Sequence, residues 1–213
     1  MRAVIFANGT FGAPWRVRQL LRPDDLIIAV DGGTRHVWEA GADPQLVVGD
    51  LDSLTLDERG RLESAGVEIA SFSPRKDQTD LELAVRRAVA EGVSSILIVA
   101  ALGGCLDQTL ANVLLLTLPE LRGVDVRIVE GRQEAFLIRD EALIEGERGD
   151  TVSLIPLAGE ATGITSSGLE WPLCDDELRL GATRGVSNVL TGERASVCVR
   201  QGLLLCVVTH VSE

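Results

Sequence analysis

The sequence predicts an α/β protein in which an N-terminal, mostly parallel, Rossmann-like sheet domain precedes a smaller antiparallel β domain. Three observations support this prediction. Short apolar runs alternate with amphipathic helical segments over residues 1–130, the helical periods vanish after about residue 140, and frequent glycines and period-two alternation follow. At 213 residues the chain is long enough for two hydrophobic cores. We therefore predict one domain over residues 1–140 and a β-sandwich or barrel over residues 141–213.

The first domain contains apolar runs with the length and composition of short buried strands. Because helical segments separate these runs, we expect a mostly parallel sheet covered by helices on both faces. The predicted strands are residues 3–7, 26–30, 46–48, 67–70, 96–101 and 124–129.

Two helices between these strands have clear start signals. Thr55 stands three residues before Glu58, which is the spacing of a capping box, and Gly66 ends that helix. The same spacing recurs between Thr79 and Glu82. In this second helix the apolar positions form a stripe that should face the sheet. The stripe consists of Leu81, Ala84, Val85, Ala88 and Val89.

The second domain shows the pattern of antiparallel strands. Ala195, Val197 and Val199 alternate with polar residues, as in a strand with one buried face. A further apolar run, residues 203–208, follows a Gln-Gly pair. We therefore expect the chain to end in a β-hairpin.

Composition excludes several classes of partner. The formal net charge of −12 would repel phosphate backbones, so nucleic acid is not expected as a partner. No apolar run reaches the ~20 residues of a membrane span, and the N-terminus lacks a signal-peptide pattern. The four cysteines form no CxxC pair and the two histidines have no ligand-spaced neighbours, so no zinc site is expected. Reduced thiols in a cytoplasmic protein fit this pattern.

Acidic residues follow four of the predicted strands at the point where each strand ends. Ligands of an open parallel sheet bind beyond the carboxyl ends of its strands, so these residues predict one shared site. The segments are Asp31-Gly32-Gly33, Gly49-Asp50-Leu51-Asp52-Ser53, Lys76-Asp77-Gln78-Thr79-Asp80 and Gly103-Gly104-Cys105-Leu106-Asp107-Gln108.

The chemistry of these segments favours a metal ion and phosphate groups. Crowded carboxylates repel one another unless a cation lies among them, and Mg²⁺ is held by carboxylates together with phosphates. In extended backbone Asp50 and Asp52 would point the same way and could reach one ion. Lys76 could neutralise a phosphate, and Gly103-Gly104 before a helix offers backbone N–H groups to an anion. Each loop alone is also typical of an ordinary turn, so the prediction depends on all four.

Together these loops resemble those of the thiamine pyrophosphokinase family. That family carries Asp-Gly-Gly, Gly-Asp-x-Asp-Ser, Asp-x-Thr-Asp and Gly-Gly-x-x-Asp-(His/Gln) segments in this order. Residues 110–112 resemble the family's helix after the last loop. Residues 168–173 and 185–188 resemble its tail segments Gly-Leu-Lys-(Tyr/Trp)-x-Leu and (Gly)-x-Ser-Asn. The resemblance spans nearly the whole chain.

The resemblance implies an activity and a division of labour. A member of this family transfers the diphosphate of ATP to the hydroxyl of thiamine, giving thiamine diphosphate and AMP. Residues 1–140 would bind ATP, and residues 141–213 would bind thiamine and dimerise, with thiamine near the interface of a homodimer. Asp50, Asp52 and Asp80 would hold magnesium.

Further residues receive candidate roles. Asp77 and Asp80 are candidate metal ligands or orienting residues, and one carboxylate is expected to accept the thiamine hydroxyl proton. Trp171 is expected either to stack on thiamine or to pack in a core or dimer interface. The remaining residues assigned to ATP or thiamine are Asp31, Gly32, Gly33, Lys76, Thr79, Gly103, Gly104, Asp107, Gln108, Ser187 and Asn188.

One departure from the family pattern leaves alternatives open. Cys105 stands where bacterial members usually carry an arginine, so a bidentate phosphate donor is missing. Arg75, Lys76 or Arg184 compensates, or turnover is slow, or the substrate differs. The alternatives are a diphosphokinase acting on another hydroxymethyl substrate, such as a pterin, and a non-catalytic nucleotide or thiamine sensor. An NAD-dependent oxidoreductase is disfavoured, because GxGxxG does not occur.

Overall fold

The chain divides between Gly131 and Arg132 into two units, which we call unit 1 (Met1–Gly131) and unit 2 (Arg132–Glu213). The structure is a computed structural model that describes residues 1–72 and 77–212. The division comes earlier than the predicted boundary after residue 140. The reason is that strand β7 (Gln133–Ile138) pairs with strand β14 (Leu204–Thr209) of unit 2.

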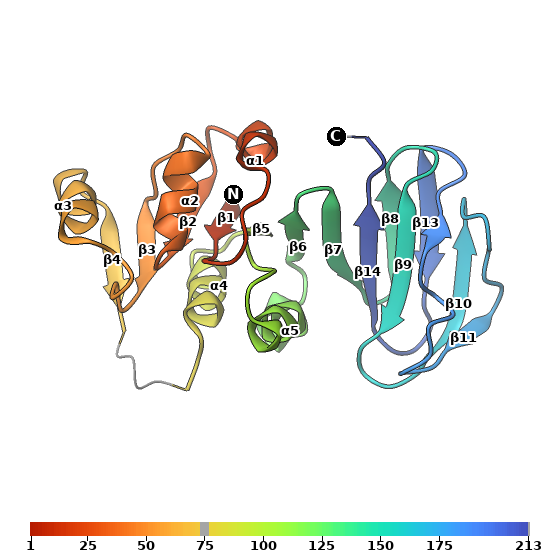
Figure 1. Ribbon diagram of the computed structural model, residues 1–213. Helices are drawn as coiled ribbons and strands as arrows, with labels where there is room; N and C mark the ends of the chain where they lie inside the picture. Colours follow the sequence, from red (N-terminus) through yellow and green to blue (C-terminus); the bar gives the residue numbers. More distant parts are fainter. Residues whose placement is uncertain (73–76, 213) are drawn as a thin grey trace. The chain divides into compact units, whose positions relative to one another are not determined.

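Unit 1 contains a parallel sheet, as the sequence predicts (Figure 1). Each pair of neighbouring strands within it runs in the same direction. In spatial order the strands are β6 (Asp125–Glu130), β5 (Ser95–Val99), β1 (Arg2–Phe6), β2 (Leu26–Val30), β3 (Leu46–Gly49) and β4 (Glu68–Ser71).

Helices cover both faces of this sheet (Figure 1). Val4 and Phe6 of β1 pack with Val17 of α1 and Val37 of α2, while α4 packs against β2 and β3 from the other face. Within the described residues, no helix has both the length and the hydrophobicity to cross a bilayer. The helices are α1 (Pro14–Leu20), α2 (Gly33–Glu39), α3 (Leu56–Ser64), α4 (Asp80–Ala90), α5 (Leu106–Leu115) and the short 3₁₀ helix η1 (Pro119–Leu121).

Both predicted helix starts are confirmed. Thr55 accepts a hydrogen bond from the Glu58 N–H at 3.3 Å, and the Glu58 carboxylate accepts one from the Thr55 N–H at 2.8 Å. Thr79 accepts from the Glu82 N–H at 3.2 Å and thereby caps α4. Of the apolar stripe predicted for α4, all members but Val89 are buried.

Unit 2 is a β-sandwich, one of the two forms predicted. One sheet has the order β12-β9-β14-β7 and the other has the order β11-β10-β13-β8. Their facing side chains, such as Leu154, Ile164, Val197 and Leu204, share one hydrophobic core. The remaining strands are β8 (Glu141–Glu145), β9 (Thr151–Pro156), β10 (Ala161–Ser167), β11 (Asp176–Leu178), β12 (Asn188–Val189) and β13 (Arg194–Cys198).

The predicted C-terminal hairpin is wrong. Strand β13 pairs with β8 and β10, whereas β14 pairs with β7 and β9 in the other sheet. Gln201, in the connection, forms a bridge with Thr162 of β10. The residues between β13 and β14 therefore lead from one sheet of the sandwich to the other. The two strands do not form a hairpin although the connection between them is short.

Candidate active site

A cavity of about 640 Å³ opens at the carboxyl edge of the unit 1 sheet. The loops after β1, β2 and β5 and the start of α4 form its walls. The predicted site residues that line it are Asp31, Thr79, Asp80, Gly103, Gly104, Cys105 and Gln108. Other lining residues, among them Asn8, Gly9, Thr10 and Asn112, received no predicted site role.

Asp31 is held in place at the end of β2. Its backbone adopts a positive φ of 45°, and its N–H donates to the Val48 carbonyl at 3.1 Å. Its carbonyl accepts hydrogen bonds from both the N–H and the hydroxyl of Thr34, at 3.0 and 2.7 Å. The carboxylate accepts a further bond from the Leu51 N–H at 3.1 Å. The loops after β2 and β3 are thus joined through one side chain.

The electrostatic environment of Asp31 is strongly acidic. Burial, together with the charges of Asp80, Asp50 and Asp52, raises the pKa of its carboxyl group to about 6, against the opposing effect of the hydrogen bond from the Leu51 N–H. Carboxylates from three different loops therefore influence one another at this edge of the sheet, as the sequence predicts.

Gly32 and Gly33 allow close packing. A Cβ atom on Gly32 would lie 2.5 Å from Asn8 Oδ1, and one on Gly33 would lie 2.2 Å from the Phe6 carbonyl oxygen. Neither glycine lines the cavity among the described residues. Their contribution is to let the start of α2 approach the end of β1.

Asp50 and Asp52 lie beside the cavity rather than in its wall. The expectation that both side chains project from extended backbone is wrong, because β3 ends at Gly49 and Leu51 has a φ of +63°. The Asp52 N–H instead donates to Asp50 Oδ1 at 3.1 Å across a tight turn. Asp52 is exposed and Asp50 is half-buried.

The loop before α4 is described only in part. Lys76, predicted as a phosphate ligand, lies outside the described residues. Asp77 is exposed and does not line the cavity. Thr79 uses its hydroxyl to cap α4, and Asp80 is the first residue of that helix. Within this loop, the cavity therefore meets Thr79 and Asp80.

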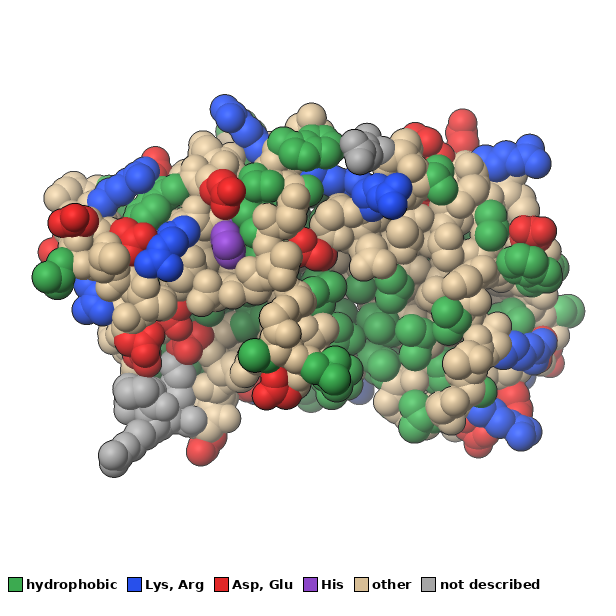
Figure 2. Space-filling model, in the orientation of Figure 1, with side chains coloured by type: hydrophobic (Ala, Val, Ile, Leu, Met, Phe, Trp, Pro, Cys, Tyr) green, Lys and Arg blue, Asp and Glu red, His purple; other side chains and the backbone are tan. Residues whose placement is uncertain are grey.

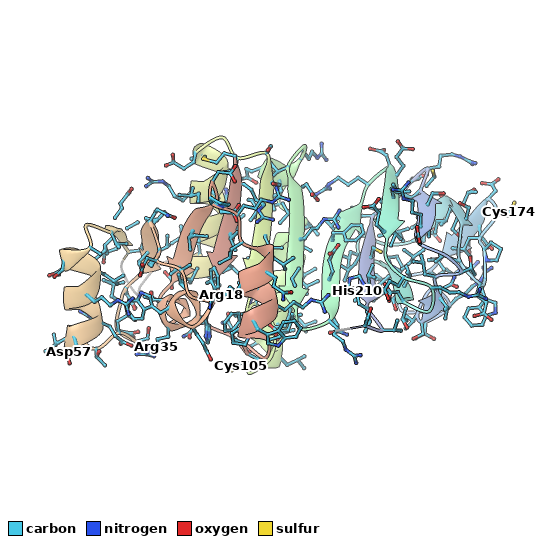
Figure 3. The ribbon with its side chains drawn as sticks, turned by 90° about the horizontal axis from the view of Figure 1, so that it is seen from above. Arg18, Arg35, Asp57, Cys105, Cys174 and His210 are labelled. Carbon is cyan, nitrogen blue, oxygen red and sulfur yellow. The ribbon has the colours of Figure 1, made fainter. Side chains whose placement is uncertain are left out.

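The loop after β5 leads into α5. Cys105 is the N-cap residue, and its exposed side chain makes no capping hydrogen bond (Figure 3). Asp107 lies in the first turn and accepts from the Gln108 N–H at 2.9 Å. Further along, buried Asn112 donates through Nδ2 to the Ala101 carbonyl at 2.7 Å. This bond ties α5 to the strand end and explains the presence of Asn112 in the cavity wall.

No sequence motif pointed to the loop after β1, which nevertheless lines the cavity. The Gly9 N–H donates to the Ala100 carbonyl at 2.7 Å, and the Thr10 N–H donates to the Leu102 carbonyl at 2.9 Å. These bonds continue the pairing of β1 and β5 beyond the strands. A signal was available, because the polar Asn8-Gly9 pair follows the first strand just as the other motifs follow theirs.

The acidic edge has the donor chemistry that a hard cation needs. Among the described residues, no three Asp, Glu, His or Cys side chains form a ready-made metal cluster. Mg²⁺ keeps several waters and commonly takes only one or two protein carboxylates together with substrate phosphates. The carboxylates of Asp50, Asp52 and Asp80, which all act on Asp31, suit such partial coordination.

Unit 2 brings together Trp171 and Asn188. Asn188 Oδ1 accepts from the Trp171 N–H at 3.1 Å, and its Nδ2 donates to the Trp171 carbonyl at 2.7 Å. Trp171 is 58% exposed, so it is not a core residue of unit 2. The neighbouring Ser187 has a φ of +63°, and its N–H donates to Ser153 Oγ at 3.0 Å. The Asn188 side chain thus fixes the backbone of Trp171, whose indole is exposed.

A doubly wound sheet with a polar, carboxylate-rimmed cavity at its carboxyl edge defines a class of α/β enzymes that bind small charged ligands there. Residues 17–128 match the family described as thiamin pyrophosphokinase, catalytic domain, and residues 141–204 match thiamin pyrophosphokinase, vitamin B1 binding domain. The chain therefore belongs to the thiamin pyrophosphokinase family and is an enzyme of the transferase class.

Similarity to individual proteins covers most of the chain. Thiamine pyrophosphokinase of Bacillus subtilis (strain 168) is 30% identical over 184 residues, which span 85% of this chain and 86% of the relative. Thiamine pyrophosphokinase 1 of Arabidopsis thaliana is 29% identical over 174 residues, spanning 72% of this chain and 61% of the relative. A crystal structure of the B. subtilis protein matches with a TM-score of 0.89 and 28% identity, covering 100% of both chains.

Proposed function

We propose that this enzyme transfers the diphosphate group of ATP to the hydroxyl of thiamine, with Mg²⁺, giving thiamine diphosphate and AMP. The observation that carries the proposal is that both units match, in order, the catalytic and vitamin B1 binding parts of one family. The polar cavity at the carboxyl edge of the unit 1 sheet gives this chemistry a location.

The main task of the protein in this reaction is to position the two substrates. The thiamine hydroxyl oxygen bonds to the β-phosphorus of ATP, the bond from that phosphorus to the oxygen of the α-phosphate breaks, and AMP leaves. We assign the phosphates to the backbone N–H groups of Gly103 and Gly104, since both glycines line the cavity just before α5. Gln108 and Thr79 lie in the same wall. Holding both substrates in line supplies most of the rate enhancement.

We assign Mg²⁺ to Asp50, Asp52 and Asp80. A bound Mg²⁺ supplies positive charge that offsets the phosphate charge and the repulsion among the carboxylates. Asp31, held by the Leu51 N–H, keeps the loop carrying Asp50 and Asp52 against the strand ends. Asp77 remains a candidate orienting residue, and one of these carboxylates accepts the thiamine hydroxyl proton.

We assign thiamine to unit 2 and propose a homodimer in which one copy's unit 2 completes the other copy's site. Trp171, Ser187 and Asn188 are the residues assigned to thiamine. The exposed indole of Trp171 suits a cation–π contact with the positively charged thiamine ring, worth ~0.5–2 kcal/mol.

Exposed leucines on α5 support the homodimer. Leu106, Leu110 and Leu114 are 73%, 56% and 51% exposed at successive turns of the helix, and hydrophobic side chains gather over α5 in Figure 2. A second copy covering this row would remove apolar surface from water. Sedimentation velocity should give a dimer for the wild type and a monomer for Leu110→Arg. A wild-type monomer with full activity would contradict the proposal.

We also propose that the enzyme works in the cytoplasm. All four cysteines are free thiols, and three of them are exposed. Exposed thiols without a disulfide partner suit a reducing compartment.

One assay tests the proposed activity. Purified protein is incubated with Mg-ATP and thiamine, and both AMP and thiamine diphosphate are quantified. We expect the two products in equal amounts, dependent on thiamine and abolished by EDTA. A parallel incubation with a hydroxymethyl pterin tests the alternative substrate. AMP release without thiamine diphosphate, or preference for the pterin, would overturn the proposal.

A further inference from the structure

A second cavity lies at the opposite, amino edge of the unit 1 sheet. Its volume is about 280 Å³, and it is lined by the first residues of β1, β5 and β6 and by the segment before β2. Arg2 lies beside Ser95 in the parallel register, and Ser95 lies beside Asp125. No residue of the proposed active site lines it.

Three of the residues that line the second cavity are arginines, although the chain as a whole is acidic. Arg2, Arg22 and Arg127 line it, with Asp125 as the one carboxylate among its lining residues, whereas the whole chain has a net charge of −12. The balance of charge at this edge is thus the reverse of that at the carboxyl edge.

Arg2 is held rigidly by a buried carboxylate. Its Nε and Nη2 donate to the two oxygens of Asp25 at 2.8 and 2.6 Å, and Nη2 also donates to the Leu20 carbonyl at 2.6 Å. Asp25 is only 7% exposed. This arrangement fixes the guanidinium plane and leaves Nη1 outside the ion pair.

The other two arginines complete the lining. The Arg22 N–H donates to Asp25 Oδ2 at 2.7 Å, which fixes the backbone at that position. The Arg22 guanidinium makes no hydrogen bond with the residues that the structure describes. Arg127 Nε donates to Asp125 Oδ1 at 3.2 Å. Asp24 and Asp25 both act on Arg2 from outside the cavity, whereas the cavity lining itself holds three guanidinium groups and one carboxylate.

We propose that this cavity binds a small phosphate-bearing anion through Arg22, Arg127 and Nη1 of Arg2. Guanidinium groups bind phosphate oxygens through charge-assisted hydrogen bonds, and Arg2 is already oriented with Nη1 outside its ion pair. The cavity is smaller than the ~300–1,000 Å³ of pockets for drug-sized ligands, so it suits inorganic phosphate, diphosphate or the phosphate end of a metabolite. This site does not depend on the proposed function.

The test uses the full chain labelled with ¹⁵N and titrated with inorganic diphosphate. We expect saturable shifts of the backbone amide signals of Ser95 and Asp125, separate from any shifts at Gly103 and Gly104. In the double variant Arg22→Gln/Arg127→Gln the Ser95 and Asp125 shifts should require roughly tenfold or more diphosphate. Arg2 is left unchanged because it neutralises buried Asp25.

Two controls keep the result interpretable. Arg148→Gln removes an exposed arginine of unit 2 and should leave the titration unchanged. Signals from Gly103 and Gly104 report whether the double variant remains folded. Titration with inorganic phosphate and with glycerol 3-phosphate distinguishes a site for the free ion from one that accepts phosphate esters. Absence of saturable shifts at Ser95 and Asp125, or identical titrations of the double variant and the wild type, would overturn the proposal.

Discussion

The Asp31 carboxylate lies so close to the backbone of Gly49 that a Cβ atom at position 49 would fall 1.8 Å from Asp31 Oδ1. The same oxygen accepts the Leu51 N–H at 3.1 Å. Gly49 also has a φ of +146°, which L-residues with side chains rarely adopt. The ends of β2 and β3 therefore fit together only when residue 49 has no side chain.

Gly49→Ala should destabilise unit 1 and abolish activity. The strained backbone costs about 1–3 kcal/mol, and the contact with Asp31 adds to that cost. Urea unfolding measures the loss. The matched control is Gly66→Ala, which also has a positive φ of 70° but has open space where the Cβ would be. Equal destabilisation by the two substitutions would show that the contact with Asp31 does not matter.

Asp31→Asn should make the metal-free protein more stable at neutral pH. Burial raises the Asp31 pKa from 3.8 to about 6, so the native state holds this proton more tightly than the unfolded state. The resulting stability is complete below pH 3.8 and is lost as the pH rises through 6. Asparagine remains neutral throughout, so the melting temperature of the variant should exceed that of the wild type above pH 6 and approach it in acid. Thermal melts in EDTA across this range test the prediction, and a constant difference would contradict it.

Asp52→Asn should leave the fold intact and slow turnover by about two orders of magnitude, a loss of ~3 kcal/mol in the transition state. Asp52 is exposed and accepts none of the hydrogen bonds described for its loop, so its removal should cost little stability. The magnesium concentration for half-maximal rate should rise. Asp57→Asn, on an exposed residue of α3, is the control. An unchanged rate and magnesium dependence would remove Asp52 from the metal site.

Cys105→Arg should raise kcat/KM for ATP by roughly 10- to 150-fold, corresponding to a charge-assisted hydrogen bond of ~1.5–3 kcal/mol. Cys105 lines the cavity and uses no side-chain atom for capping, so the change disturbs little. Of the expected compensating residues, Arg184 already forms a bidentate ion pair with Asp176. Arg75 and Lys76 lie outside the described residues.

The control for this prediction is Cys174→Arg, at an exposed cysteine of unit 2 (Figure 3). It adds the same charge to the chain elsewhere. If Cys105→Arg and alanine variants of Arg75, Lys76 and Arg184 all leave the kinetics unchanged, the loop after β5 does not contact the transferred group.

The sequence predicted the layout of unit 1 because apolar runs and capping residues are local signals. The Thr55 and Thr79 caps depend on residues three positions away, and both are present in the structure. The clustering of acidic loops followed from one topological rule, that parallel strands end at a common edge. The charge of Asp80 raises the pKa of Asp31 although the two residues follow different strands, which agrees with that rule.

The errors concern features that local patterns do not encode. Because Leu51 has a positive φ, the backbone from Asp50 to Asp52 is not extended. Leucine rarely adopts a positive φ, so the sequence does not predict this conformation. β13 and β14 pair with strands that are distant in the sequence, β8 and β9, and so lie in different sheets. The short connection between them gives no sign of this. The loop at Asn8-Gly9 could have been found by applying the strand-end rule to the first strand as well.

The placement of β14 sets an order of events during protein synthesis. Strand β14 lies between β9 and β7, so the last strand of unit 2 to leave the ribosome is an inner strand of its sheet. The strands of the unit 1 sheet all lie before Gly131. The strands of unit 1 are therefore all synthesised while β7 and β9 still lack the strand that joins them, and the edges that β14 will cover stay unpaired until Thr209 has been made.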